Sequence, residues 1–410
     1  MSLSIGVFIV GIANLAGVIL ERGLIARFFH FASLCFVFLT CLGLIYFNSG
    51  EVVGFARKIF IEEAIEKGVQ VVFSFISILT VSAIVFRKIA LNYQISISRR
   101  IRVIGKRQGN RFYLVSLSMM CLYIFTIYPS QIFSRSSHLV ETPVPQIRSM
   151  HGIFIILGIF SALVPLTVKC KVPKYIGYLQ LVLWLLLAVA KESRSSLIVM
   201  AAFMYLIWVN STSRMFRFLG FIIMFFSSLV VYFLITINRN AYSHGLLYIF
   251  QTPLDQKVFS IWFENLAFIL PVIGYTTLVA QPSTEFILTS LNPMPGGIAG
   301  WGTFSGKSAI SSFVPFSGLG LSYAYGVSFF YFLWSVVFTI MAMSIRIIKL
   351  PLFRIPVLLS FGLALTLISQ YELRSGIRYI YFGLAISILQ LMLKNNTNSA
   401  KHNPSTGETK

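Results

Sequence analysis

Acidic residues are scarce in this chain of 410 residues. It holds 12 Asp and Glu residues against 33 Lys and Arg residues, and Asp255 is the sole aspartate. No two carboxylates form a D-x-D or similar pair. A Mg²⁺ or Mn²⁺ ion that bridges a nucleotide-sugar diphosphate normally needs such oxygen ligands. The sequence therefore disfavours metal-dependent transfer from a nucleotide sugar.

Motifs for metal, nucleotide and protease chemistry are missing as well. The five histidines show no H-E-x-x-H or other ligand spacing, and there is neither a Walker A loop nor a G-x-S-x-G elbow. The four cysteines lie within or at the end of apolar runs and imply neither a disulfide framework nor a metal site. ATP-driven transport and membrane proteolysis lose support, and we expect no metal and no cofactor.

The chain is rich in hydrophobic residues and poor in charged ones. Hydrophobic residues make up 57% of the chain, and charged residues only 11%, whereas a soluble domain carries about 25% charged residues. The net charge of +21 comes from basic residues placed between apolar runs, which is typical of membrane topology signals. We therefore expect an all-α polytopic membrane protein whose surroundings are lipids, and no nucleic-acid partner.

Apolar runs of the length needed to cross a bilayer recur along the chain. A helix needs about 20 mainly apolar residues to cross, because the hydrocarbon core is about 30 Å thick. On this rule we expect about 11 transmembrane helices, or 12 at most. They are predicted at 3–20, 28–47, 69–86, 112–128, 152–168, 176–190, 196–209, 218–236, 323–344, 355–369 and 379–393.

Basic connectors predict the orientation. The segment 87–111 holds eight Lys and Arg residues and no acid, so the positive-inside rule places it in the cytoplasm. Counting from it puts the N-terminus outside and the C-terminus inside. We expect an N-terminal bundle of eight spans over 1–236, a large extracytoplasmic loop over 237–322, a C-terminal bundle of three spans over 323–393 and a disordered cytoplasmic tail over 394–410. Within the loop, the apolar stretch 266–280 is predicted to be a short buried or interfacial helix, because Pro271 and Gly274 interrupt it.

Four arginines at expected outer helix ends are the main candidates for binding an anion. They are Arg194, Arg239, Arg374 and Arg378. The last two are four residues apart and share a face if their segment is helical. A guanidinium is permanently charged and its donors match phosphate oxygens. Arginines at helix ends also reach commonly to lipid headgroups, but the positive-inside rule does not favour them on the outer side.

Other polar and aromatic residues of the outer segments are candidates for acid–base chemistry or for stacking on sugars. His244, Glu264, Glu285 and Glu372 are candidate bases, and each has an ordinary structural role as the alternative. The candidate substrate-binding residues are Tyr242, Trp262, Trp301 and Glu372, with Tyr248 and Tyr275 as further aromatics.

Short motifs within this architecture resemble the O-antigen polymerase family, the Wzy-type repeat-unit polymerases. They are Ser-Arg-Ser-Ser at 193–196, Asn-Pro-Met-Pro-Gly-Gly at 292–297, Pro-Phe-Ser-Gly-Leu-Gly at 315–320 and Leu-Arg-Ser-Gly at 373–376. The long outer loop late in the chain adds to the resemblance. The chain departs from the family after the Gly-Leu-Gly turn, where it reads Leu321-Ser322-Tyr323 and the family often has a glutamate.

The resemblance implies a GT-C-like, metal-independent inverting glycosyltransferase of the bacterial inner membrane whose active site faces the periplasm. Donor and acceptor would both be undecaprenyl-pyrophosphate-linked oligosaccharides, and a chain-length regulator would be a partner protein. Arg194, Arg239 and Arg374 or Arg378 would hold the pyrophosphate, with His244 or a loop glutamate assisting. Two alternatives stay open, namely an O-antigen ligase and a lipid-linked oligosaccharide flippase or other transporter.

Overall fold

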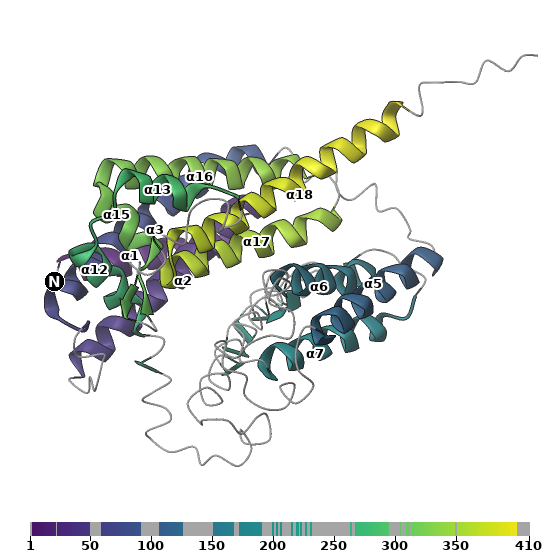
Figure 1. Cartoon of the computed structure of the whole chain (residues 1–410), viewed down its shortest axis with the longest axis horizontal. Coiled ribbons are helices and arrows are strands. Elements are labelled where there is room, and N and C mark those ends of the chain that lie inside the picture. The colour runs from purple at the N-terminus through teal and green to yellow at the C-terminus, as the bar shows by residue number, and fades with distance from the viewer. Residues whose placement is uncertain are drawn as a thin grey trace, which may run out of the picture. The chain divides into compact units, whose positions relative to one another are not determined.

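The computed structural model is almost entirely helical (Figure 1). It describes residues 2–21, 23–49, 59–91, 106–125, 151–167, 172–190, 267–294, 309–311, 314–348 and 351–399, with scattered residues at 199–231, 263–264 and 304. The helices are α1 (Ser2–Leu20), α2 (Leu24–Asn48), α3 (Glu62–Leu91), α5 (Lys106–Phe125), α6 (His151–Thr167), α7 (Lys174–Ala190), α12 (Ile269–Val279), α13 (Thr284–Leu291), α15 (Gly318–Tyr325), α16 (Val327–Ile347), α17 (Pro351–Gln370) and α18 (Leu373–Ser399). One antiparallel hairpin joins β1 (Ala309–Ser311) and β2 (Val314–Pro315).

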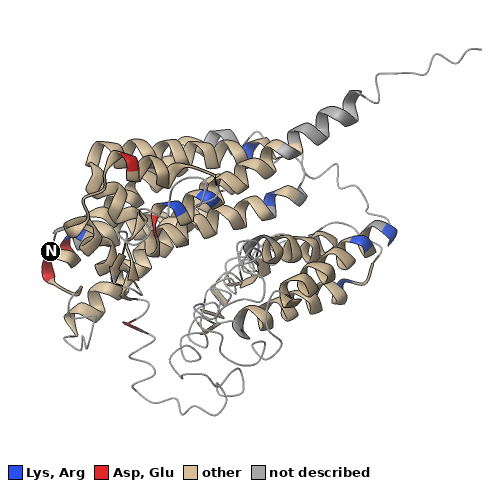
Figure 2. Cartoon of the chain, viewed as in Figure 1, with Lys and Arg blue, Asp and Glu red and all other residues tan. Residues whose placement is uncertain are grey.

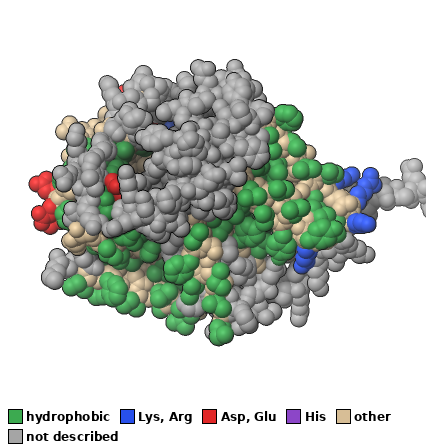
Figure 3. Space-filling model, turned by 90° about the horizontal axis from the view of Figure 1, so that it is seen from below, with side chains coloured by type: hydrophobic (Ala, Val, Ile, Leu, Met, Phe, Trp, Pro, Cys, Tyr) green, Lys and Arg blue, Asp and Glu red, His purple; other side chains and the backbone are tan. Residues whose placement is uncertain are grey.

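Three of the described helices have the length and composition of membrane-spanning helices. Leu24–Asn48, Glu62–Arg87 and Val327–Ile347 are long and apolar enough to cross a bilayer, and several other described helices are apolar but shorter. Few of the described helical residues are charged (Figure 2), and hydrophobic side chains cover much of the described part of the face in Figure 3. The protein is an all-α membrane protein, as predicted.

Most predicted spans coincide with helices of the structure. Among the described residues, α1, α2, α3, α5, α6 and α7 cover the first six predicted spans, and α17 and α18 cover the last two. The predicted spans 196–209 and 218–236 fall mostly outside the described residues. The apolar stretch 266–280 forms the eleven-residue helix α12, much of it buried, which agrees with the prediction of a short buried helix.

The predicted start of the span 323–344 is wrong. The chain breaks at Gly326, where φ is 157° and ψ is 138°, a conformation that residues with a Cβ atom rarely adopt. Tyr323 therefore belongs to the preceding helix α15, and the long helix α16 begins at Val327. The hydrophobic run continues through the break, so apolar composition alone did not show it. At the other end of the chain, α18 continues to Ser399, so the first six residues of the predicted disordered tail, 394–399, are helical.

The chain divides into two compact units, each made of stretches that are distant in sequence. The first combines Met1–Val37, Glu62–Asn92 and Val272–Lys410, and the second combines Phe38–Ile61 and Tyr93–Pro271. The predicted regions, 1–236, 237–322, 323–393 and 394–410, are consecutive stretches of the chain, whereas each compact unit combines separate stretches.

Aromatic side chains form the centre of the first unit. The Phe75 ring centroid lies 5.0 Å from that of Trp334 and 5.4 Å from that of Phe338, and Phe29 lies 5.5 Å from Phe338. Edge-to-face and tilted contacts at such distances are favourable beyond the area they bury. The indole of Trp334 donates to Ser322 Oγ at 3.2 Å, which satisfies its only polar atom. These contacts join α2, α3, α15 and α16.

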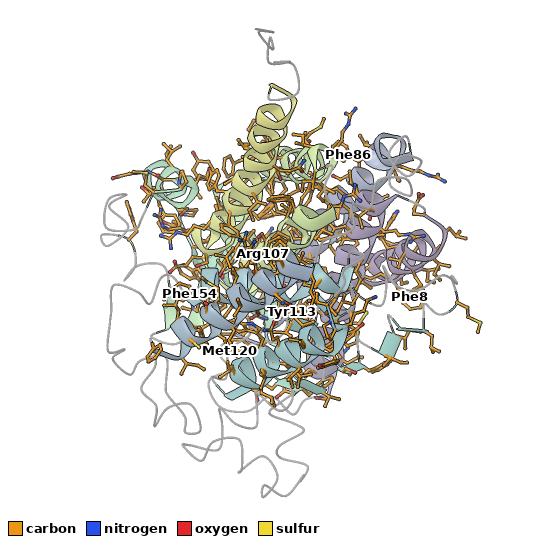
Figure 4. The ribbon with its side chains drawn as sticks, turned by 90° about the vertical axis from the view of Figure 1, so that its right-hand side faces the viewer. Phe8, Phe86, Arg107, Tyr113, Met120 and Phe154 are labelled. Carbon is orange, nitrogen blue, oxygen red and sulfur yellow. The ribbon has the colours of Figure 1, made fainter. Side chains whose placement is uncertain are left out.

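The second unit contains the bundle of α5, α6 and α7. Figure 4 labels Tyr113, Met120 and Phe154, which are buried residues of α5 and α6. Gln180 Nε2 donates to the Tyr113 carbonyl at 2.9 Å, and the Trp184 indole donates to Ser116 Oγ at 3.3 Å. These two hydrogen bonds between facing helices each satisfy a buried donor, the Gln180 amide nitrogen and the Trp184 indole, which apolar surroundings favour.

Candidate functional site

The turn between α17 and α18 is the place where distant parts of the first unit meet. The Gly318 amide donates to the Tyr371 carbonyl at 2.8 Å, and Ser317 Oγ donates to the Ile368 carbonyl at 3.3 Å. A Cβ atom on Gly318 would lie 2.8 Å from the Leu373 Cα. Glycine is therefore required for this close approach of α15 to the turn.

The start of α15 is fixed from a second side by α12. The buried hydroxyl of Thr276 accepts a hydrogen bond from the Ser317 amide at 3.0 Å. Ser317 itself caps α15, since its side chain accepts from the Gly320 amide. The short helices α12 and α15 are therefore held together against the α17–α18 turn.

Arg374 joins the same turn to α13. Its side chain is 2% exposed. Its two terminal nitrogens donate to the Thr289 and Met294 carbonyls, which lie in the last turn of α13 and just beyond it. The carbonyls at a helix C-terminus have no partner within the helix and carry partial negative charge. The guanidinium therefore caps α13.

A second residue of α18 strengthens this contact. Tyr381 lies seven residues after Arg374 and donates to the Leu291 carbonyl at 2.7 Å. Residues at i, i+4 and i+7 share one helix face. Arg378 thus lies between these two residues on the face of α18 that holds the end of α13, and its side chain is exposed.

The charge environment of the two arginines differs. Both residues lie before the membrane span predicted at 379–393. Burial lowers the pKa of Arg374, the like charge of Arg378 lowers it further, and Glu372 opposes the shift. A guanidinium nevertheless stays protonated in proteins. Arg374 and Arg378 are thus a pair of neighbouring positive charges, one buried against carbonyls and one open to solvent.

The contacts bring together three motifs that are far apart in sequence. Asn292–Met294 begins the first motif, Ser317–Gly320 ends the second and Leu373–Gly376 is the third. The hydrogen bonds of Arg374 link the first motif to the third, and the close approach of Gly318 links the second to the third. These are motifs on which the family resemblance rests.

No protein-family model, curated protein or solved structure matches this chain. Assignment of the site therefore depends on its residues and on the sequence motifs.

The other predicted site residues lie in different parts of the chain. Arg194, Arg239, His244, Tyr242, Trp262 and Trp301 lie outside the residues that the structure describes. Glu372 lies beside Arg374 in the α17–α18 turn and is half-buried. Glu285 is exposed in the first turn of α13, where a carboxylate is favourable to the helix dipole.

Glu264 belongs to the second unit. Burial raises the pKa of its carboxyl group, and a hydrogen bond with Tyr46 opposes this shift. A raised pKa is one property of a general base or acid, but it also occurs at structural positions. Across the described part of the chain, no group of three or more His, Cys, Asp or Glu side chains is placed to hold a metal ion.

A buried polar cluster inside the first unit was not predicted. Asn14 Nδ2 donates to Thr80 Oγ1 at 3.0 Å, and Asn14 Oδ1 lies 2.7 Å from His30 Nδ1. The cluster joins α1, α2 and α3, and Gly17 lets the imidazole pack against α1. His30 lies within the predicted span 28–47, but its partners could not be identified without the helix pairing.

Proposed function

We propose that this protein is an O-antigen polymerase, a glycosyltransferase that joins undecaprenyl-pyrophosphate-linked oligosaccharide repeat units. In this proposal it is a GT-C-like protein with about 11 spans in the bacterial inner membrane. The loop and the site face the periplasm, and catalysis needs no metal ion or cofactor.

The observation that supports the proposal is the meeting of the three motifs at the α17–α18 turn. Their resemblance to the polymerase family rests on short sequences, each of which is a weak signal alone. The motifs span residues 292–376, yet hydrogen bonds and close backbone approach link them in one place. If the three motifs form one site, their occurrence together in one chain has a functional reason.

The arginine content of this region suits the proposed reaction. The acceptor hydroxyl attacks the anomeric carbon of the donor sugar, a new glycosidic bond forms, and the bond from that carbon to the pyrophosphate oxygen breaks. The pyrophosphate leaves with the bonding electron pair, and positive side chains stabilise its charge. The hydroxyl proton passes to a base, for which His244 and the loop glutamates are the candidates. The remaining requirement is to position two large lipid-linked substrates.

The alternative transporter function predicts ionisable residues that line a path through the spans. The buried cluster of Asn14, His30 and Thr80 is a polar group inside described helices, so it bears on this alternative. Its side chains bond to one another, and His30 is its one ionisable member. The cluster is therefore explained as a contact that holds α1, α2 and α3 together, and it does not favour transport.

A deletion strain separates the three functions. Loss of a polymerase leaves lipid A-core capped with a single repeat unit. Loss of a ligase leaves it with none, and loss of a flippase leaves repeat units on the cytoplasmic leaflet. We expect the single capped unit, seen by gel electrophoresis of surface lipopolysaccharide. Either of the other two phenotypes would contradict the proposal.

Arginine variants test the site in the same strain. We expect Arg194→Ala and Arg378→Ala to abolish long polysaccharide while single repeats are still made and exported. Arg346→Ala is a matched control, because Arg346 lies in the last turn of α16, on the side predicted to be cytoplasmic. Normal chain lengths in both site variants would remove the arginines from the proposed site.

A further inference from the structure

The two arginines of α18 have different roles, and we infer that Arg374 is a positioning residue, whereas Arg378 contacts the pyrophosphate. In this arrangement Arg374 holds the end of α13 and the Asn292–Met294 motif against α18. This division of roles rests on the proposed function, but the placement of α13 by Arg374 can be measured independently of activity.

The contacts of Arg374 leave it poorly suited to bind a ligand. Its side chain is nearly inaccessible, and its two terminal nitrogens already donate to the Thr289 and Met294 carbonyls. Turning the guanidinium toward a ligand would break both charge-assisted bonds and would remove the cap from α13. Its charge therefore stabilises the protein fold at this point.

The position of Arg378 suits the other role. It lies one turn further along α18 and is exposed, between two residues that hold the end of α13, Arg374 and Tyr381. Its exposure leaves the guanidinium accessible, and the donors of a guanidinium match phosphate oxygens. The buried arginine also places a second positive charge within one helical turn.

The motif that Arg374 holds has an ordered local structure. The Asn292 side chain accepts a hydrogen bond from the Met294 amide at 2.9 Å, so the chain turns immediately after α13. Tyr381 donates to the carbonyl of Leu291 just before this turn. With Arg374, α18 therefore fixes both the last turn of α13 and the direction in which the chain leaves it.

A distance measurement tests the placement of α13. Spin labels would be attached at Leu288→Cys on α13 and Ile388→Cys on α18, both exposed positions. The four native cysteines would be replaced by serine. We expect a narrow distance distribution in the otherwise wild-type protein and in Arg378→Ala, and a broad one in Arg374→Ala. Arg374→Lys should restore a narrow distribution, because an ammonium group can still donate to both carbonyls.

Ligand binding tests the division of roles, with undecaprenyl pyrophosphate in detergent as the probe. We expect Arg378→Ala to weaken binding about tenfold or more, since one charge-assisted contact is lost. Arg374→Lys should bind as the wild type does, and its turnover should recover relative to Arg374→Ala.

Two results would overturn the inference. One is a narrow distance distribution in Arg374→Ala. The other is loss of undecaprenyl pyrophosphate binding in Arg374→Lys with α13 still in place, because Arg374 would then contact the ligand itself. A wild-type protein that joins no repeat units would contradict the proposed function, whereas broadening in Arg374→Ala and its rescue by lysine would still support the positioning role.

Discussion

Substitution of Gly274 by alanine should separate α12 from α3. A Cβ atom at Gly274 would lie 1.7 Å from the Ala64 carbonyl oxygen and 2.6 Å from the Gly68 amide nitrogen. Ordinary contact begins at about 3.4 Å, so the two helices would have to move apart by roughly 1.5 to 2 Å. Overpacking of a core costs about 1–3 kcal/mol. Backbone atoms cannot rotate away as a side chain can, so we expect the upper end, about 3 kcal/mol.

The effect should extend to the candidate site. Thr276 of α12 accepts the hydrogen bond of the Ser317 amide, and Ser317 caps α15. Displacement of α12 therefore weakens the start of α15, where Gly318 meets the α17–α18 turn. We expect the Gly274→Ala variant to be less stable and also to make shorter polysaccharide.

The matched control is Gly362→Ala in α17. A Cβ atom at Gly362 would meet nothing within 4 Å. Alanine in a helix interior is more favourable than glycine by roughly 0.5–1 kcal/mol. Thermal unfolding of both purified variants in the same detergent is the assay. We expect a lower midpoint for Gly274→Ala and an unchanged or higher one for Gly362→Ala. Equal midpoints for Gly274→Ala and the wild type would refute the reasoning.

Three further substitutions test other contacts. Asn14→Leu should destabilise the protein by about 1–3 kcal/mol in thermal unfolding, because His30 loses its buried partner; an unchanged midpoint would contradict this. Tyr381→Phe should cost about 0.5–1.5 kcal/mol, the net value of its hydrogen bond to Leu291, and a larger loss would point to a further role of the hydroxyl. Glu264→Gln should flatten the pH dependence of stability. Burial raises the pKa of Glu264 above 4.5 in the folded protein, so the wild type loses stability as pH rises above that value and the glutamine variant does not. Parallel pH profiles of the two proteins would exclude this contribution.

The helices were the most predictable part of the fold. An apolar run of bilayer length is expected to be helical, because the α-helix is the conformation in which a single segment hydrogen-bonds all of its own backbone N–H and C=O groups in lipid. The break at Gly326 was missed since its neighbours Tyr325 and Val327 keep the run apolar, and only the backbone angle there shows it. The start of α3 was also placed too late. It begins at Glu62, seven residues before the predicted span 69–86, which left out Glu62, Glu63 and Glu66 because they do not belong to an apolar run.

Long-range pairing limited the prediction of the site. Arg374 was recognised as a candidate by its charge and its place near a helix start. Its partner Thr289 lies 85 residues earlier, so nothing local in the sequence indicates the cap. Asn14 and Thr80, 66 residues apart, could not be paired for the same reason. Residue chemistry indicates which side chains can bind an anion. Helix packing decides which of these side chains already form hydrogen bonds within the protein and are therefore not available to a ligand.

Polymerisation by the purified protein tests the central claim most directly. The protein would be placed in lipid vesicles with undecaprenyl-pyrophosphate-linked repeat units extracted from the deletion strain, in buffer that contains a metal chelator. The proposal predicts a ladder of lipid-linked products longer by one repeat unit at each step, formed by the wild type and lost in Arg378→Ala. Recovery of unchanged single repeat units from the wild-type vesicles, with and without divalent metal ions, would contradict it.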